Sequence, residues 1–300
     1  MAGLGQNVGT QFALRSRMNG SATVGGQSIA TWYYAEQGTG PGTGFMGDRQ
    51  IPSVHIEPIE GQLITVDFFN ESMMPHTIHL HGLDVDQAND GVPETSATVY
   101  PMQSTTYQFT APHAGTYHYH CHVDTVLHYP MGMHGGVIVR PPDGSIDKAW
   151  AGGPTFDEEV LWQLHTVDRS WHSLMGSGPQ TARFHPDGFL LNGKEEPASL
   201  DDPYTKVVCP LGGKAYIRMI NAAFQWARVS LGGLTFEIVA TDGRPMPTPI
   251  AAGTWEIGPG ERYDLLVSGT QVGQYIAQID YLDDYTGAVL GSARTRVEIV

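Results

Sequence analysis

The stretch AGTYHYHCHVDTVLHYPMGM, residues 114–133, decides how this chain of 300 residues is interpreted. It contains Cys121, with His128 seven residues later and Met133 five residues after that. A cysteine thiolate, two imidazoles and a weakly bound thioether make the trigonal site that holds copper for electron transfer. The stretch therefore predicts such a copper site, with one imidazole still to be found.

The missing imidazole is expected upstream, in HTIHLHG at residues 76–82. Residues two apart along a β-strand share a face, and residues an odd number apart face opposite ways. His79 and His81 therefore point to one side of the predicted strand, and His76 points to the other.

The same rule divides the consecutive residues His120, Cys121 and His122, because it sends the two imidazoles to one face and the sulfur to the other. Two metal sites are thus predicted back to back. The inward site is expected to consist of His76, Cys121, His128 and Met133, and the outward site of His79, His81, His120 and His122. Since Cys121 is bonded to both neighbouring histidines, an electron at the inward copper has a covalent route outward, which suggests a redox enzyme.

Some assignments remain open between two interpretations. Met131 is an alternative to Met133 as axial ligand, although the larger loop favours Met133. His118 shares the face of the outward histidines and is either a replacement ligand or, as we favour, a neighbour that supports the ligands. His165 and His172 either complete the outward site across a subunit interface or, as their position favours, have a structural role.

Composition favours an all-β chain, because 37 glycines and 20 prolines separate many short runs of Val, Ile, Tyr and Thr. The formal charge of -15 argues against a nucleic-acid partner, which would need clustered Lys and Arg. No apolar run approaches the roughly 18–20 residues needed to span a bilayer, so no membrane association is expected. The glycine-rich residues 38–44 match neither a dinucleotide fingerprint nor a P-loop and are expected to form a flexible loop.

The two cysteines cannot form a disulfide framework, and Cys209 is expected to be a buried thiol. The first 20 residues lack the apolar segment of a secretion signal. The chain is expected in the cytoplasm if it is full length, and in the periplasm or outside the cell if a signal has been removed. The compartment is therefore unknown.

The second half of the chain repeats the first. EGQLITVDFFN at residues 60–70 reappears as GGKAYIRMIN at residues 212–221, and DGVP at residues 90–93 reappears as DGRP at residues 242–245. Aligning the copies pairs His76 with Ala227, His79 with Ser230, His81 with Gly232, His120 with Gln278, Cys121 with Ile279 and His122 with Asp280. The second copy thus lacks every aligned ligand.

Two domains follow from this duplication. A segment rich in proline and glycine follows residue 140 and marks the boundary between them. We expect a copper-binding domain at residues 1–145, including an N-terminal extension at residues 1–50 with one strand at residues 29–35. Residues 146–300 are expected to form the second domain, without copper ligands.

HTIHLHG, the turn that begins at Asp90, and AGTYHYHCH with its trailing His128 and Met133 resemble the multicopper oxidases. The resemblance is closest to the two-domain, laccase-like enzymes with the blue, type 1 copper in the N-terminal domain. It covers about residues 50–300 and is strongest over residues 75–140. It implies two tandem cupredoxin-like β-sandwiches and a homotrimer.

The resemblance also assigns roles to the two predicted sites. It implies that the inward set binds type 1 copper and that the outward set contributes to a type 2 or type 3-like copper centre. Asp90 would donate protons beside that centre, although an aspartate before glycine is equally a turn residue. In the family, the second domain of a neighbouring subunit supplies further histidines, and this chain has none at the aligned positions. The number of coppers in the outward site therefore remains open.

The expected function is the one-electron oxidation of a small phenolic or aromatic reductant at the type 1 copper, with transfer to the second centre and dioxygen. Cys121 and Asp90 are the expected catalytic residues, and His128 is expected to be the exposed ligand nearest the reductant. One alternative is a blue-copper electron carrier with a vestigial outward site. The other is a nitrite-reductase-like enzyme, which also has two cupredoxin domains.

Overall fold

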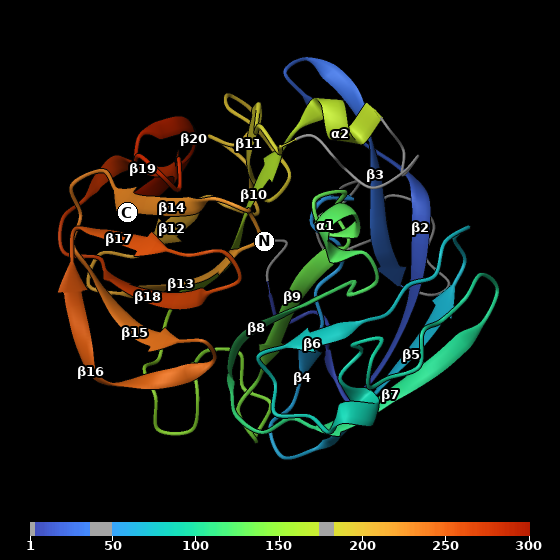
Figure 1. Cartoon of the computed structure of the whole chain (residues 1–300). Coiled ribbons are helices and arrows are strands. Elements are labelled where there is room, and N and C mark those ends of the chain that lie inside the picture. Colours follow the sequence, from blue (N-terminus) through green and yellow to red (C-terminus); the bar gives the residue numbers. More distant parts are fainter. Residues whose placement is uncertain (1–3, 37–49, 174–182) are drawn as a thin grey trace.

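The structure is a computed structural model of the chain and describes residues 4–36, 50–173 and 183–300. The glycine-rich residues 38–44 lie outside these ranges. Strands dominate the described part, which contains only the short helices α1 (Thr125–His128) and α2 (Arg169–Ser173) and the 3-10 turn η1 (Gln87–Asn89). Figure 1 shows two β-sandwiches side by side. Among the described residues, no helix is both long and apolar enough to cross a membrane.

The first sandwich encloses one hydrophobic core between two main sheets. The larger sheet has the order β3-β2-β5-β7, with strands Gln27–Glu36, Gln11–Val24, Leu63–Asn70 and Ser104–Thr110. The smaller has the order β6-β8-β9, with strands His79–His81, Gly115–His120 and His134–Val139. A short pair joins β1 (Val8–Gly9) to β4 (Glu57–Pro58). Along β5, every second side chain is buried (Ile64, Val66 and Phe68), as the period of a strand with one covered face requires.

Residues 1–50 hold two long strands where one was expected. The expected strand lies within β3, and β2 is an additional central strand that runs parallel to β5. Phe12 and Leu14 of β2 join the core, but Arg15 and Arg17 alternate with buried positions and hide the apolar pattern in the sequence. This segment is therefore built into the first sandwich.

The second sandwich also has two sheets around its own core. One sheet has the order β11-β10-β13-β18-β15-β16, with strands Gly188–Leu191, Glu158–Val167, Lys214–Asn221, Arg262–Ser268, Phe236–Thr241 and Arg244–Ala252. The other has the order β12-β20-β19-β14-β17, with strands Val207–Cys209, Val289–Ile299, Gly273–Leu282, Trp226–Leu231 and Thr254–Ile257. Cys209 is buried, as expected.

The duplication is visible at one corner of each sandwich. Strands β5 and β13 both end in an asparagine, Asn70 or Asn221. Each side-chain amide donates to the carbonyl four residues later, at 2.8 Å to Met74 and 2.9 Å to Gln225. The predicted all-β class and the tandem arrangement are confirmed.

A buried network of charges joins the two sandwiches. Arg140, just after β9, donates from Nε to Glu57 at 2.6 Å and makes two bonds to Glu159 of β10, at 3.0 and 2.9 Å. Arg218 of β13 donates to the same Glu159 at 2.6 Å. Both arginines are fully buried. The boundary at residue 145 lies between β9 and β10 and stays a prediction.

Candidate metal centres

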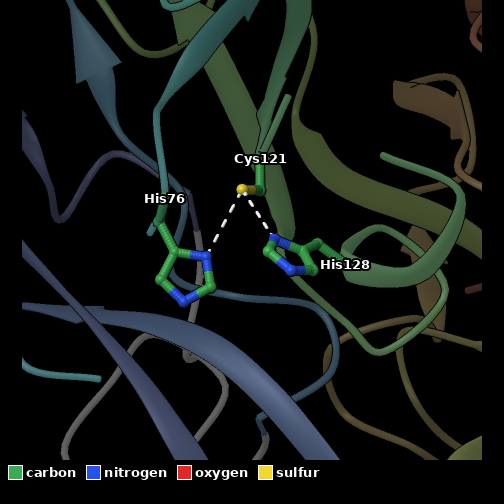
Figure 2. A group of neighbouring side chains, drawn as sticks. All are labelled: His76, Cys121 and His128. Atoms are coloured by element: carbon green, nitrogen blue, oxygen red, sulfur yellow. Dashed lines mark hydrogen bonds between the residues drawn. The ribbon is translucent and has the colours of Figure 1, made fainter. Parts of the chain in front are cut away.

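Three of the four predicted inward ligands converge on one point. The Sγ atom of Cys121 lies 3.4 Å from Nδ1 of His76 and 3.2 Å from Nδ1 of His128. Figure 2 shows the sulfur between the two rings, each of which turns its Nδ1 atom toward it. One ligand atom from each residue lies within 4.8 Å of the others, and all three side chains are buried.

Local structure places each of these ligands. His76 forms an isolated bridge with Val99, with hydrogen bonds of 3.0 and 3.1 Å in the two directions. His128 closes helix α1. Strand β8 ends at His120, so Cys121 and His122 lie beyond the strand to which the alternation rule assigned them, and the N–H of Cys121 donates to the carbonyl of Met133 at 3.0 Å. The loop that carries His128 and Met133, called the ligand loop below, is therefore held against the cysteine by a backbone hydrogen bond.

Burial keeps the inward ligands uncharged in the absence of metal. It raises the pKa of the Cys121 thiol to about 11 and lowers the pKa of His128 to about 4. It also lowers the pKa of His76 well below its ordinary value, with a further contribution from His128. One sulfur and two neutral imidazole nitrogens facing the same point fit copper, which favours this combination in trigonal sites.

The axial ligand stays a prediction. Met131 and Met133 are both buried beside the inward group and belong to the same core cluster as Cys121. The carbonyl contact with Cys121 places Met133 next to the sulfur-bearing residue in the backbone.

The expectation that His128 is exposed is wrong, because its side chain is fully buried. The indole ring of Trp32 packs edge-on against the imidazole at a centroid distance of 5.2 Å. The backbone N–H of Trp32 donates to the carbonyl of Met131 at 2.9 Å, which fixes β3 to the ligand loop. The N-terminal strands thus cover the inward site. Trp32 carries no local pattern that marks this role, because the contact arises only in the folded chain.

The outward residues also gather, although not all four converge equally. Ligand atoms of His79, His81 and His120 lie within 4.8 Å of one another. Strand pairing sets this group, since β6 and β8 align His79 with His120. The ring of His122 lies beside it, with centroid distances of 5.1 Å to His79 and 5.9 Å to His120. The outward site therefore presents a tight trio of imidazoles and one adjacent imidazole.

Asp90 lies against the outward trio in two ways. Its backbone carbonyl is 2.8 Å from Nδ1 of His79, and its Oδ1 atom is 3.2 Å from the same nitrogen. A proton on Nδ1 that is donated to the carbonyl leaves Nε2 of His79 free for a metal. Gly91 permits this contact, because its φ is +77° and an added Cβ would lie 1.9 Å from the carbonyl oxygen of Ile78.

His118 is buried behind the outward trio. Its ring stacks on His81 at a centroid distance of 4.3 Å, and its Nε2 atom is 3.4 Å from the hydroxyl of Tyr129. It does not belong to the group of converging ligand atoms among the described residues. This arrangement suits a side chain that orients a ligand.

His165 and His172 contact backbone carbonyls of the first sandwich. His165 places Nε2 3.1 Å from the carbonyl of Pro130, and His172 places Nδ1 2.7 Å from the carbonyl of Ala30. Within the chain they therefore hold the second sandwich against β3 and the ligand loop, as the structural interpretation expects.

The second copy reproduces the strand pairing of the outward site without its imidazoles. Ser230 pairs with Gln278 in the same way as His79 pairs with His120. The side chains of Gln278 and Ser292 instead donate to Asp280, at 2.7 and 2.6 Å. This face of the second sandwich offers oxygen and amide groups in place of metal-binding nitrogens.

Comparisons with known proteins agree with this geometry. Two family models, each described as multicopper oxidase, match residues 29–144 and 162–296. Laccase-15 of Oryza sativa subsp. japonica is 33% identical over 240 residues, which cover 73% of this chain and 37% of that protein. The chain belongs to the multicopper oxidase family. Copper is the cofactor that this membership implies, and the resemblance expected from the sequence is confirmed.

Other members of the multicopper oxidase family extend the comparison. Multicopper oxidase MmcO of Mycobacterium tuberculosis is 28% identical over 73% of this chain and 46% of its own length. The chain thus spans less than half the length of these curated relatives. The crystal structure of blue copper oxidase from Nitrosomonas europaea matches 96% of this chain and 85% of its own, with a TM-score of 0.78 and 27% identity. The expected tandem cupredoxin-like fold is confirmed.

Proposed function

We propose that the chain is a laccase-like oxidoreductase that takes single electrons from a small phenolic or aromatic reductant and delivers them to dioxygen. Cys121, His76, His128 and Met133 would hold a type 1 copper, and His79, His81, His120 and His122 would hold a second, type 2 or type 3-like copper centre. Copper in both groups supplies the one-electron chemistry that such a reaction needs.

The position of Cys121, within the inward group and next to His120 in the chain, is the observation that carries this proposal. Its sulfur belongs to the inward trio, and its peptide bond joins it to His120 of the outward trio. The two groups are thus connected through covalent bonds of one dipeptide, without a gap across solvent. A protein that only stores copper has no need of two ligand groups linked in this way.

Asp90 is suited to manage protons at the outward group. Its side chain is partly exposed, and its Oδ1 atom lies 3.2 Å from a ring nitrogen of His79. A carboxylate that reaches both solvent and the ligand shell is able to relay protons between them, and dioxygen reduction requires such protons. Replacing Asp90 by asparagine keeps the turn and removes this function.

The reductant needs a docking place away from His128, because Trp32 covers that ligand. A cavity of about 580 Å³ lies between β2 and the residues after β11, and its lining includes Ile51, Glu195, Glu196, Pro197 and Tyr204. Ile51 also forms the wall behind the ligand loop, since a Cβ added at Gly132 would lie 2.7 Å from its Cγ1 atom. One side chain thus lies between the cavity and Gly132, which stands between Met131 and Met133 in the chain.

The lining of this cavity suits a small aromatic reductant, because it combines apolar side chains with a few polar and charged ones, which include Lys194, Glu195 and Glu196. Ala198→Trp should raise the KM for the reductant and leave the blue absorption intact. Ser104→Trp, in a separate cavity beside β5 and β7, is the matched control. Equal KM values in the two variants would place the docking site elsewhere.

We also propose a homotrimer, the assembly that the resemblance to the two-domain enzymes implies. His79 is 17% exposed, and the outward trio therefore reaches a surface that a neighbouring subunit could cover. In this chain, a second sandwich placed there would bring groups such as Ser230 and Gln278 in place of imidazoles. Sedimentation of the copper-loaded protein, in comparison with an outward-site variant, tests the assembly.

A blue-copper electron carrier is the second candidate, and the missing imidazoles of the second sandwich favour it. The two functions separate when copper content, the thiolate-to-copper absorption and oxygen consumption are measured on the same samples. Oxidase function predicts that Cys121→Ser abolishes the blue colour, and that His79→Ala keeps the colour but loses a copper and stops oxygen consumption. His113→Ala, at an exposed position, serves as the control. Blue protein with one copper per chain and no oxygen consumption would reject the oxidase and favour the carrier.

A further inference from the structure

Two exposed methionines lie at the corner of the first sandwich that leads to His76. Met73 is 87% exposed, and Met102 is 72% exposed. Met74, which follows Met73 in the chain, is partly buried and packs against the core cluster that contains Cys121. Burial thus increases from Met73 through Met74 to His76, which is fully buried. A series of metal-binding side chains therefore runs from the surface to the inward group.

The buried residue Asn70 holds the backbones of these methionines together. Its side-chain amide donates to the carbonyls of Met74 and Val99, at 2.8 Å each, and its own carbonyl accepts the N–H of Met102 at 2.8 Å. The segments at residues 71–75 and 100–103 are therefore each tied to the same residue by a hydrogen bond. This corner fixes where the methionine side chains begin, while their three rotatable bonds let the sulfur atoms adjust around an ion.

The corner itself does not require methionine. Asn221 makes the equivalent corner in the second sandwich and donates to the carbonyl of Gln225 at 2.9 Å. In both copies the N–H two residues after the asparagine donates to its Oδ1 atom at 3.0 Å. The second copy has the sequence NAAFQ at residues 221–225, where the first has NESMM at residues 70–74. Since the same structure forms without thioethers, the methionines of the first sandwich need another explanation.

The corner also leads directly to the inward group. His76 exchanges backbone hydrogen bonds of 3.0 and 3.1 Å with Val99, whose carbonyl is also bonded to Asn70. The Nδ1 atom of His76 faces Cys121 at 3.4 Å (Figure 2), while its Nε2 atom is buried without a hydrogen-bond partner. The second ring nitrogen is therefore available to an incoming ion. Because all three inward side chains are buried, copper needs such an entry point.

The chemistry of the corner selects Cu(I) over Cu(II). Thioether sulfur is a soft ligand that prefers Cu(I), whereas carboxylate and water oxygens suit harder cations. Next to Asn70 in the chain, Glu71 pairs with Arg15 at 3.1 Å and with Arg17 at 3.2 Å, so these three side chains carry one net positive charge. This charge repels a divalent cation more strongly than a monovalent one, because the Coulomb energy is proportional to the charge of the ion.

We propose that Met73, Met74 and Met102 form a surface site that captures Cu(I) and passes it to His76, and from there to the inward group. At each step the bond from copper to a thioether breaks as a bond to the next ligand forms. The Cys121 thiol releases its proton to solvent when its sulfur binds the ion. No electron is transferred, so the ion arrives as Cu(I). The inference rests on the proposed copper occupancy of the inward group, but not on oxidase turnover.

The rate at which Cu(I) loads the inward group tests this inference on the full, metal-free chain. Cu(I) is supplied from a bicinchoninate buffer, and ferricyanide added at set times oxidises the bound ion, so that the blue absorption reports the loaded fraction. A double variant with Met73→Leu and Met102→Leu keeps the side-chain volume and removes both sulfur atoms. It should load Cu(I) about tenfold more slowly, the effect of losing about 1.4 kcal/mol of capture affinity. Its loading by Cu(II) should be unchanged. The matched control is Met246→Leu, at a partly buried methionine of the second sandwich.

Nuclear magnetic resonance of the methionine methyl groups measures the capture site directly. Excess Ag(I), a redox-inert analogue of Cu(I), should shift the signals of Met73 and Met102 in the metal-free protein and leave the signal of Met246 in place. Unchanged signals of Met73 and Met102 would overturn the inference. Equal Cu(I) loading rates in the double variant and in Met246→Leu would overturn it as well. An equal slowing of Cu(I) and Cu(II) loading would have the same consequence, since it would indicate a general change in structure.

The outcomes also separate this inference from the proposed function. Unchanged protein that takes up Cu(I) but never turns blue would reject the inward type 1 copper, and the capture site with it. Blue protein that consumes no oxygen would count against the proposed oxidase alone and leave the capture site standing.

Discussion

Replacing Arg140 by methionine should destabilise the protein by about 3–5 kcal/mol at neutral pH, the usual cost of removing one partner from a buried ion pair. Arg140 is fully buried, and its two partners Glu57 and Glu159 are 0% and 7% exposed. Methionine fills similar volume, so the loss should come from the two carboxylates that no longer face this cation. Glu57 would keep its hydrogen bonds with His55 and the backbone N–H of Gly5, and Glu159 would keep its contact with Arg218.

The pH dependence gives this prediction its sharpest form. Burial alone would raise the pKa of Glu57, but hydrogen bonding from His55 and the charge of Arg140 lower it from 4.5 to about 2. A folded-state pKa below the unfolded value means that the stabilisation is complete above pH 4.5 and disappears as the pH falls toward 2. A shift of this size corresponds to about 3 kcal/mol.

The variant should depend less on pH in this region. Without Arg140, Glu57 loses one of the two groups that hold its pKa down, so its folded-state pKa moves up toward the unfolded value. The difference in unfolding free energy between the two proteins should therefore shrink as the pH falls from 4.5 toward 2.

Urea unfolding of the metal-free protein at several pH values, followed by fluorescence and circular dichroism, measures this difference. Arg294→Met is the control, because Arg294 pairs with Glu196 at the surface and its loss should leave the midpoint nearly unchanged. A cost for Arg140→Met below about 1 kcal/mol, the level of a surface pair, would refute the reasoning. A cost that stays constant with pH would refute it equally.

Three further predictions concern the metal groups. Loading the inward group with Cu(II) near pH 7 should release about one proton per chain, since the Cys121 thiol, with a pKa of about 11, must lose its proton while the imidazoles are already neutral. An indicator dye measures the proton release, and Cys121→Ser should abolish it. Gly91→Ala should lower copper retention at the outward group but not the blue absorption, because the added Cβ would clash with the carbonyl of Ile78 and displace Asp90 from His79. An unchanged copper content in elemental analysis would contradict this prediction. Trp32→Ala should destabilise the chain by about 3–5 kcal/mol. It should also speed the reduction of the blue copper, measured by stopped flow, because it uncovers His128. A slower reduction would mean that the indole assists electron transfer.

The sequence was most informative where chemistry depends on spacing along a strand. The odd or even spacing of residues in HTIHLHG and in His120-Cys121-His122 predicts two ligand groups. The structure gathers the inward group around Cys121 and includes His120 in the outward group. The parity rule needs only the period of a strand, so it holds without knowledge of the fold. It placed His122 less well, because β8 ends at His120 and the residues beyond it no longer follow the strand.

Features that depend on contacts between distant segments were not predictable in this way. Trp32 and Arg140 lie far in sequence from His128 and Glu57, which they contact, and each looks ordinary in its own neighbourhood. Strand β2 was missed for a related reason, since its buried positions include Ser16 and its intervening arginines break the apolar alternation. Tertiary packing decides such positions, and a single sequence records no trace of it.

The asparagine corner shared by Asn70 and Asn221 has a consequence for how the mature protein arises. The second sandwich keeps this corner and the strand pairing around it while carrying no imidazole at the aligned ligand positions. Its architecture is thus maintained without metal ligands at these positions. The first sandwich shares that architecture, so newly synthesised protein should fold before it meets any copper. Copper insertion would then be a late maturation step, limited by how ions reach ligand groups that are already folded and largely buried.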